Sequence, residues 1–153
     1  MKVNYDTFHE KYGNFDQLTI NDYNPGDGIP PHFDTHSPFE DAFCSLSLAS
    51  GAVMSFFFND KTQHLYIKPR SIVFFTGEAR FVWEHSIALR RIDRVANDIF
   101  FRRRRLSLTF RKIRKTDCSC PYVNFCDSQK KKLTSVSPLS DYNLIADKTS
   151  VGK

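Results

Sequence analysis

The sequence lacks any apolar run approaching the roughly 20 residues that a membrane-spanning helix needs, so no membrane partner is expected. It lacks a leader with an apolar core, which predicts an intracellular protein, cytoplasmic or nuclear, whose thiols stay reduced. It also lacks internal repeats, which excludes a repeat array. Cysteine is scarce at four residues of 153, and in a reducing compartment those four are candidate metal ligands.

What the sequence has instead is aromatic residues and positive charge. Of its 153 residues, 41% are hydrophobic and 14% aromatic, with 15 phenylalanines, which suffices for one compact domain with a large aromatic core. A chain of this length buries roughly 68–70% of the surface that it exposes when unfolded. The net charge of +5 and the isoelectric point of about 9.1 favour a polyanionic partner. The excess is concentrated in Arg102–Arg105, Arg111–Lys115 and Lys130–Lys132.

Short alternating or apolar segments separated by turn residues predict a mainly β fold, either a sandwich or a barrel. The expected strands are Asp16–Tyr23, Ala42–Ala49, Ala52–Phe58, Leu65–Lys68, Ser71–Phe75, Ile87–Arg91 and Leu106–Ile113. Turn chemistry marks Asn24–Gly28 and Asn59–Thr62. Residues 1–129 are expected to form the domain. Residues 130–153, rich in Lys, Ser and Thr, are expected to form a flexible tail.

Two histidines and an aspartate form a candidate iron site. His32 and Asp34 are two residues apart, so on a strand their side chains share a face, with Cα atoms roughly 7 Å apart. His85 is the best candidate for a third ligand from elsewhere in the chain. Two histidines and one carboxylate can hold Fe(II) while leaving positions open for O2 and a co-substrate. A His-x-Asp pair also arises by chance, so the assignment depends on the residues that accompany it.

Two arginines add a site for an acidic co-substrate. Arg105 and Arg111 bracket an alternating segment, which places both on one face of a strand with Cα atoms roughly 20 Å apart. Two guanidiniums that converge on opposite ends of a five-carbon diacid fit this spacing, because arginine binds carboxylates in a bidentate way. The alternative is an exposed basic strand edge, to which Arg102, Arg103 and Arg104 are assigned.

The motifs together resemble those of the AlkB dioxygenases, which use Fe(II) and 2-oxoglutarate. Asn21–His36 is similar to the core motif of that family, and Arg105–Arg111 is similar to its closing strand. Within the family, a finer match is to the branch that modifies the wobble uridine of tRNA. That finer match is carried by Phe43–Leu48, Thr76–His85, Cys118–Cys120 and Cys126–Gln129. The resemblance covers residues 16–129.

The resemblance implies a double-stranded β-helix, or jelly roll, and an oxidative reaction. It implies that Arg105, assisted by Tyr23, pairs with the distal carboxylate of 2-oxoglutarate, while Arg111 and Asn21 lie at the metal end. The implied substrates are O2 and 5-methoxycarbonylmethyluridine in the anticodon loop, hydroxylated on its side chain. Two alternatives stay open: demethylation of N-alkylated bases, and a zinc-stabilised RNA-binding fragment without turnover.

The chain also departs from the resembling family. Longer members carry an RNA-recognition domain and a methyltransferase domain, for which 153 residues leave no room. Only Met1–Phe15 stands where the family has its nucleotide-recognition lid, so a fragment, a short isoform or an incomplete gene model is expected. Ser86 occupies a position that is usually glycine.

The cysteines predict a second metal site. Cys118, Cys120 and Cys126 cluster in a short segment, and three cysteines in a reducing compartment suggest Zn(II) with a fourth ligand. His36 is the candidate, because it lies about 13 Å beyond His32 on a continuing strand and so cannot share the iron. The resemblance implies the same Cys3His set, which would staple the C-terminal segment to the jelly roll. The alternative is a disulfide or idle thiols, and Cys44 is expected to be a packed core thiol.

Overall fold

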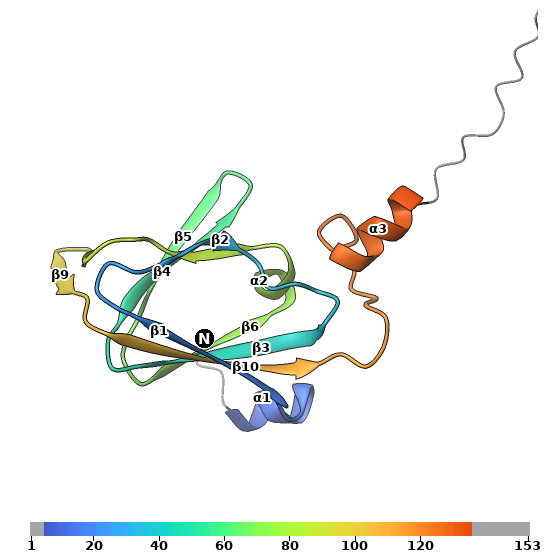
Figure 1. The fold of residues 1–153 in the computed structure, drawn as a ribbon, viewed down its shortest axis with the longest axis horizontal. Coiled ribbons are helices and arrows are strands. Elements are labelled where there is room, and N and C mark those ends of the chain that lie inside the picture. The colour runs from blue at the N-terminus through green and yellow to red at the C-terminus, as the bar shows by residue number, and fades with distance from the viewer. Residues whose placement is uncertain (1–4, 136–153) are drawn as a thin grey trace, which may run out of the picture.

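Residues 5–135 are described by a computed structural model, in which two four-stranded antiparallel sheets face each other (Figure 1). Sheet A has the order β1-β10-β3-β6, sheet B has the order β2-β7-β4-β5, and β8 and β9 form a separate hairpin. The strands are β1 (Gln17–Tyr23), β2 (Ile29–His32), β3 (Phe39–Leu48), β4 (Ala52–Phe58), β5 (Lys61–Ile67), β6 (Ser71–Thr76), β7 (Glu84–Ile87), β8 (Ile92–Val95), β9 (Asp98–Phe101) and β10 (Arg105–Ile113), and the helices are α1 (Tyr5–Tyr12), α2 (Gly77–Phe81) and α3 (Asp127–Ser135). The predicted mainly β jelly roll is confirmed.

The aromatic core lies between the two sheets. Phe43 of β3 stacks on Phe75 of β6 at 4.2 Å between ring centroids, and both side chains are almost fully buried. Met54 of β4 and Ile87 of β7 complete the packing from sheet B. Burial of each such side chain stabilises the fold by about 1.5–3 kcal/mol relative to leaving it in water. The core therefore fixes the distance between the sheets and the space that the site occupies.

Most predicted strands are present, but β8 and β9 have no predicted counterpart, and the strand expected to start at residue 87 was placed too late in the chain. The predicted strand Ile87–Arg91 is wrong, because the observed strand is Glu84–Ile87. Pairing with β4 sets its position, since Phe57 lies opposite Glu84 and Ser55 opposite Ser86. The predicted turn at 59–62 is also too long. It contains only Asn59 and Asp60, and β5 starts at Lys61. Asn59 has φ of +50°, a left-handed conformation that asparagine tolerates.

The β8–β9 hairpin is anchored by a buried ion pair. Asp93 is fully buried, and its carboxylate accepts hydrogen bonds from Nε and Nη2 of Arg102, both at 2.7 Å. Arg90 donates to the same carboxylate at 2.8 Å. Although burial raises the pKa of Asp93, these hydrogen bonds and one from the Val53 backbone amide lower it overall. The assignment of Arg102 to the solvated face is therefore wrong, whereas Arg103 is exposed as predicted.

Gly28 allows the edge strand β2 to approach β7 in sheet B. A Cβ atom on Gly28, just before β2, would lie 2.2 Å from the carbonyl oxygen of Ile87. Only glycine permits this approach, which brings the backbone of β2 against β7. The resulting register pairs Ile29 with Ile87 and His32 with His85.

Helices α1 and α3 lie outside the two sheets. Phe8 of α1 packs on the outer face of sheet A against Phe74, at 4.3 Å between ring centroids. Helix α3 lies beyond the end of the sheets (Figure 1). The predicted boundary at residue 129 falls within this helix, and the remainder of the predicted tail, residues 136–153, lies outside the described residues. Within residues 5–135, each helix is too short or too polar to cross a membrane.

Candidate functional site

The two histidines of the candidate iron site come from neighbouring strands of sheet B. His32 ends β2 and lies directly opposite His85 of β7, with ring centroids 4.4 Å apart. Asp34 follows two residues later, and its carboxylate lies 3.9 Å from Nε2 of His32. One ligand atom from each of the three residues lies within 4.8 Å of the others. The structure thus brings together the three side chains that the sequence singled out.

Asp34 reaches this position from a loop rather than from a strand. The expectation that His32 and Asp34 share one strand face is wrong, because β2 ends at His32. Two arginines hold the loop instead. Arg111 of β10 donates from Nε to the Asp34 carboxylate at 2.5 Å, and Arg80 of α2 donates to the Asp34 carbonyl at 2.7 Å. The position of the carboxylate is therefore set by contacts across the fold.

Both histidines have the properties of metal ligands. Nδ1 of His32 lies 2.8 Å from the Pro30 carbonyl, and a tautomer that donates there leaves Nε2 free to bind a cation. Burial, reinforced by the nearby His32, lowers the pKa of His85 to about 4, so its ring is neutral at physiological pH. Nδ1 of His85 is buried without a hydrogen-bond partner, the only such side-chain nitrogen or oxygen among the described residues. A neutral, unsatisfied imidazole beside a carboxylate fits Fe(II).

A polar pocket extends from these three residues along the inner face of sheet A. It is lined by Asn21, Tyr23, Ile29, His32, Asp34, Phe43, Ser45, Met54, Phe75, His85, Ile87, Arg105, Ser107, Thr109 and Arg111. The inner face of β10 is polar because Ser107 and Thr109 point into this pocket and are buried, whereas Leu106 and Leu108 lie half-buried on the outer face. All four predicted co-substrate residues, Asn21, Tyr23, Arg105 and Arg111, line the same pocket.

Arg105 is a buried cation without an acidic partner. Its side chain donates to the Ser47 hydroxyl at 2.8 Å and its guanidinium carbon lies 5.6 Å from the centre of the Tyr23 ring. Burial lowers the pKa of Arg105, and Arg102 acts in the same direction. In residues 5–135, no carboxylate lies within ion-pair distance of it. A buried unpaired charge is costly, so this end of the pocket suits a carboxylate ligand.

Arg111 is already paired at the metal end. Besides the Asp34 carboxylate, it donates to Thr19 Oγ1 at 3.0 Å and Gln17 Oε1 at 3.2 Å, and its guanidinium lies over the Phe39 ring. These contacts occupy much of its hydrogen-bonding capacity. The hypothesis that Arg105 and Arg111 bind opposite ends of one diacid stays a prediction, but the two arginines differ in their contacts. Arg105 faces the free end of the pocket, and Arg111 holds the carboxylate of Asp34, a candidate iron ligand.

Sequence reasoning missed the role of Arg80. Its side chain is 1% exposed and donates to three backbone carbonyls, those of Asp34, Thr35 and Glu40. These contacts fix the loop that joins Asp34 to His36. Burial lowers the pKa of Arg80, although the nearby Asp34 acts in the opposite direction. A lone arginine between Ala79 and Phe81 gives no periodic signal, so only the fold reveals its role.

A second cluster lies beyond this loop. Nδ1 of His36 is 3.5 Å from Sγ of Cys120, and ligand atoms of His36, Cys120 and Cys126 all lie within 4.8 Å of one another. A tetrahedral zinc site with Zn–S near 2.3 Å and Zn–N near 2.0–2.1 Å has an N–S edge of about 3.6 Å, which matches. Cys118 lies outside that set of three, although it is buried in the same cluster beside the Cys120 thiol.

The surroundings of the cluster orient its ligands. His36 Nε2 lies 2.8 Å from the Phe81 carbonyl, which favours the tautomer that leaves Nδ1 free. Although burial raises the pKa of Cys126, hydrogen bonds from Ser128 and Gln129 lower it to about 6. Burial and the neighbouring sulfurs raise the pKa of Cys120 to about 12, and a bound cation would reverse that shift. The donor set fits Zn(II).

Cys44 belongs to the core, and the loop that carries Asp34 is held by α3. Cys44 of β3 is buried, and burial raises its pKa to about 11, as expected of a packed core thiol. The Asp127 carboxylate of α3 accepts hydrogen bonds from the backbone amides of His36 and Ser37 at 3.1 and 3.0 Å. All four cysteines are free thiols. The segment after β10 is thus tied to the loop that carries Asp34.

Comparison with known proteins agrees with this geometry. The family model described as 2OG-Fe(II) oxygenase superfamily matches residues 7–111. The tRNA (carboxymethyluridine(34)-5-O)-methyltransferase ALKBH8 of Macaca fascicularis is 44% identical over 143 residues, which covers 82% of this chain and 22% of that protein. The alkylated DNA repair protein ALKBH8 homolog of Arabidopsis thaliana is 41% identical over 138 residues, covering 77% of this chain and 40% of that protein.

These relatives confirm the resemblance to AlkB proteins, and the chain spans less than half the length of either. The solved structure of OsALKBH1 has the same fold, with a TM-score of 0.51 and 20% identity, over 65% of this chain and 48% of that one. Because the family model covers residues 7–111, well over half of the 153 residues, this protein belongs to the 2OG-Fe(II) oxygenase superfamily.

Proposed function

We propose that the chain is the oxygenase domain of a tRNA-modifying enzyme and hydroxylates 5-methoxycarbonylmethyluridine at the wobble position. The observation that carries the oxygenase assignment is the pocket itself. One end holds His32, Asp34 and His85, and the other holds the buried Arg105, which has no acidic partner within residues 5–135. A cation bound at the first end, and a diacid whose far carboxylate reaches Arg105 at the second, would give the polar groups at both ends their partners.

The protein's own residues have distinct tasks in this reaction. His32, Asp34 and His85 would hold Fe(II), which together with 2-oxoglutarate supplies O2 activation coupled to decarboxylation. Arg111 holds the Asp34 carboxylate in place through the bond at 2.5 Å. The aromatic side chains of Phe43 and Phe75 pack against the His85 ring and restrict water on its inner side.

Arg105 is proposed to bind the distal carboxylate of 2-oxoglutarate. Ser47 fixes its Nε, which leaves terminal nitrogens for a bidentate pair. The pKa of Tyr23 is raised by burial, so its hydroxyl stays protonated and can donate to the same carboxylate. Asn21 lies opposite Ser107 in the ladder of β1 and β10, between the two ends of the pocket. We propose that its amide contacts the co-substrate at the metal end.

The proposed substrate follows from the relatives and the charge. The Macaca relative is named for chemistry at carboxymethyluridine 34 of tRNA. An unpaired anticodon-loop base can be splayed out of its strand into a pocket, and the net charge of +5 suits an RNA partner. A second candidate, demethylation of N-alkylated bases, is favoured by the name of the Arabidopsis relative, an alkylated DNA repair protein. A methyltransferase domain would act on the same tRNA in longer proteins.

We also propose that His36, Cys118, Cys120 and Cys126 bind one structural Zn(II). Three of the four already lie within 4.8 Å of one another. Cys118 would need only a local adjustment, since its thiol is beside that of Cys120. A closed site of this kind needs four ligands, and His36 with the three cysteines supplies them.

Product analysis tests the proposed reaction. The chain, supplied with Fe(II), 2-oxoglutarate and bulk tRNA, is expected to release succinate and to add one oxygen to 5-methoxycarbonylmethyluridine. Mass analysis of the digested nucleosides detects this product. Loss of a methyl group from an N-alkylated base would support the demethylase instead. Binding of tRNA without succinate, in a chain that contains both metals, would overturn both enzymatic assignments.

Arg105→Lys tests the co-substrate site. The KM for 2-oxoglutarate is expected to rise by roughly tenfold or more, because a charge-assisted hydrogen bond is worth about 1.5–3 kcal/mol and lysine cannot form the bidentate pair. The matched control is Arg103→Lys, since Arg103 is exposed, and its KM should stay near that of the unmodified chain. Equal KM values in the two variants would show that the arginine assignment is wrong.

A further inference from the structure

We propose that the outer face of sheet B holds a single-stranded stretch of nucleic acid, with a phosphate beside the β8–β9 hairpin and a neighbouring base on an aromatic surface. This site is separate from the iron pocket, which lies between the sheets. The choice of RNA as the strand rests on the proposed function. Two pockets on this face, one cationic and one aromatic, carry the inference.

The first pocket, called the hairpin pocket, lies between the β8–β9 hairpin and sheet B. It has a volume of about 300 Å³ and is lined by Val53, Ser55, His64, Tyr66, Arg90, Arg94, Val95 and Ala96. Three of its polar side chains, those of Ser55, His64 and Tyr66, come from sheet B, and its two arginines come from the hairpin segment. Groups that converge from two elements form a concave site, which a single exposed strand cannot do.

The hairpin pocket carries an excess of positive charge. Among the described residues, Asp93 is the one acid paired with Arg90, and the same carboxylate is shared with Arg102. Arg94 has no carboxylate within ion-pair distance among residues 5–135. The ion pair also fixes the guanidinium of Arg90, whose side chain remains 44% exposed. A rigid, half-exposed guanidinium beside an unpaired one is suited to a phosphate.

Further polar groups complete the hairpin pocket. Ser55 Oγ and Nδ1 of His64 are 2.9 Å apart, so each holds the other in place. Tyr66 stacks on Phe100 of the hairpin at 4.3 Å between ring centroids. Burial, together with Asp93, raises the pKa of Tyr66, which keeps its hydroxyl protonated. Hydroxyl, imidazole and guanidinium groups thus face one space, as in sites that bind the oxygens of a phosphate.

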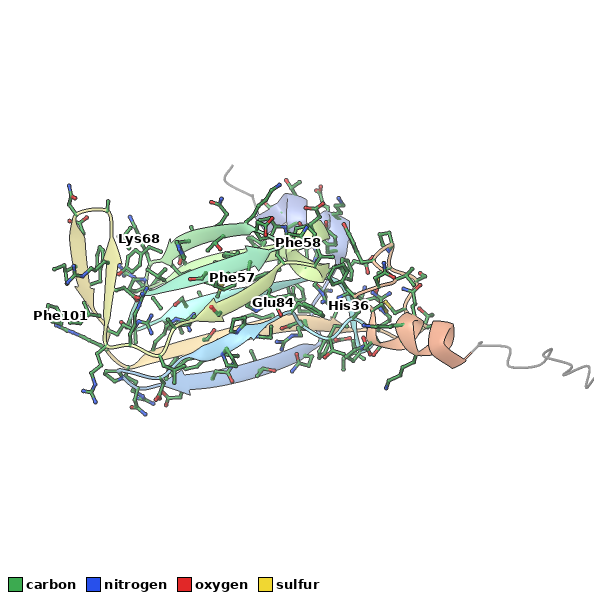
Figure 2. All side chains as sticks on the ribbon, turned by 90° about the horizontal axis from the view of Figure 1, so that it is seen from above. His36, Phe57, Phe58, Lys68, Glu84 and Phe101 are labelled. Carbon is green, nitrogen blue, oxygen red and sulfur yellow. The ribbon has the colours of Figure 1, made fainter. Side chains whose placement is uncertain are left out.

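The second pocket, called the aromatic pocket, lies on the same face toward the zinc cluster. It has a volume of about 190 Å³ and is lined by Phe33, Phe57, Phe58, Asn59, Val82, Glu84 and Phe125. Phe125 packs on Phe33 and Phe58 at 6.2 and 6.3 Å between ring centroids. Figure 2 looks onto this face and shows Phe57 and Glu84 between Phe101, at the hairpin end, and His36, at the zinc end.

The spacing of the two pockets fits adjacent parts of one strand of nucleic acid. Ser55 and Phe57 are two residues apart on β4, so their side chains share the outer face with Cα atoms roughly 7 Å apart. Binding of single strands combines a cationic groove for the backbone with aromatic rings for the bases. The Glu84 carboxylate repels phosphate and accepts hydrogen bonds from a base. It therefore assigns the phosphate to the hairpin end and the base to the aromatic end.

The test measures binding of the full chain to a short, fluorescein-labelled single-stranded RNA by fluorescence anisotropy at several salt concentrations. Arg94→Gln is expected to weaken binding several-fold. It should also reduce the slope of log K against log salt by about 0.7, because one phosphate contact is lost. Phe57→Ala should weaken binding by about tenfold without changing the slope, because stacking releases no counterions.

The matched control is Lys112→Gln, which removes the same charge from β10 in the other sheet. Binding and slope should both stay near those of the unmodified chain. Thermal melting and RNA-independent turnover of 2-oxoglutarate verify that each variant is folded. An unchanged slope in Arg94→Gln, or the same change in Lys112→Gln, would overturn the proposal.

Inorganic phosphate separates a nucleic-acid site from a small-anion site. The proposal expects phosphate to compete with the RNA only weakly, and through Arg94. Tight phosphate binding that is lost in Arg94→Gln while RNA affinity is retained would show a small-anion site and overturn the proposal. The anisotropy assay needs no turnover, so an absence of RNA binding at the two pockets would leave the oxygenase assignment unaffected. An absence of hydroxylation would likewise leave the result of the RNA-binding assay valid.

Discussion

Asp34→Ala is expected to abolish 2-oxoglutarate turnover while zinc stays bound. Asp34 is the single carboxylate of the proposed iron triad, and the change would leave only His32 and His85 as candidate ligands. Loss of a group that merely orients a metal ligand typically costs roughly 10–100-fold in affinity or activity. Loss of the ligand itself should exceed this range. Succinate release measures the turnover, and metal analysis of the purified variant measures the zinc.

The control for this prediction is Asp41→Ala. Asp41 also forms a carboxylate–guanidinium pair, with Arg114 at 2.6 Å, but 62% of its side chain is exposed and it is absent from both metal clusters. The control should retain turnover, since exposed ion pairs contribute about 0–1 kcal/mol to stability. Asp34→Ala also leaves Arg111 without its carboxylate, so thermal melting must accompany the assay. Full turnover in Asp34→Ala would rule out the triad.

Cys120→Ser is expected to release about one zinc per chain and to lower the melting temperature strongly. Zinc binding by small structural sites contributes apparent free energies of about 10–16 kcal/mol, which count toward folding. Here the site would join the segment after β10 to the loop that carries Asp34. Arg80 already fixes that loop through the carbonyls of Asp34 and Thr35. Loss of zinc should therefore also impair iron binding, which succinate release in excess Fe(II) would report.

Cys44→Ser is the matched control for the zinc prediction. Cys44 is as buried as the cluster cysteines but lies on β3, away from them. A serine there costs stability because burial of an unpaired hydroxyl is unfavourable, yet the zinc content should not change. Purified chain prepared without added zinc should contain nearly one equivalent. A chain without zinc, or a Cys118–Cys126 disulfide in reduced extract, would contradict the assignment.

Local sequence patterns predicted much of the candidate site. Residue type and spacing indicated His32 and Asp34, with His85 as the best candidate from elsewhere in the chain, and the alternation of Leu106–Phe110 placed Arg105 and Arg111 on one face. Strand β4 was predicted with its observed bounds, because a bulky apolar run between turn residues has few alternatives. The mainly β class follows from many short segments of this kind.

The sequence did not predict which arginines are buried where burial depends on partners distant in the chain. Arg102 and Arg103 are adjacent and identical in type, yet one is buried on Asp93 and the other is exposed. Nothing local distinguishes them, since the partner lies nine residues earlier on a separate strand. The same holds for Arg80, whose three acceptors are backbone carbonyls more than 35 residues away.

The sequence by itself determined which candidate donor groups this protein has: two histidines and a carboxylate proposed for iron, a basic strand proposed for a diacid, and clustered thiols proposed for zinc. Residue type, together with the short spacing of His32 and Asp34 and of the three clustered cysteines, indicates these groups before the fold is known. Only the tertiary structure decided which arginine faces the pocket and which one orients Asp34. It alone placed a basic and an aromatic pocket along one face of sheet B. Pairing between strands far apart in the chain sets these positions, and local periodicity does not encode it.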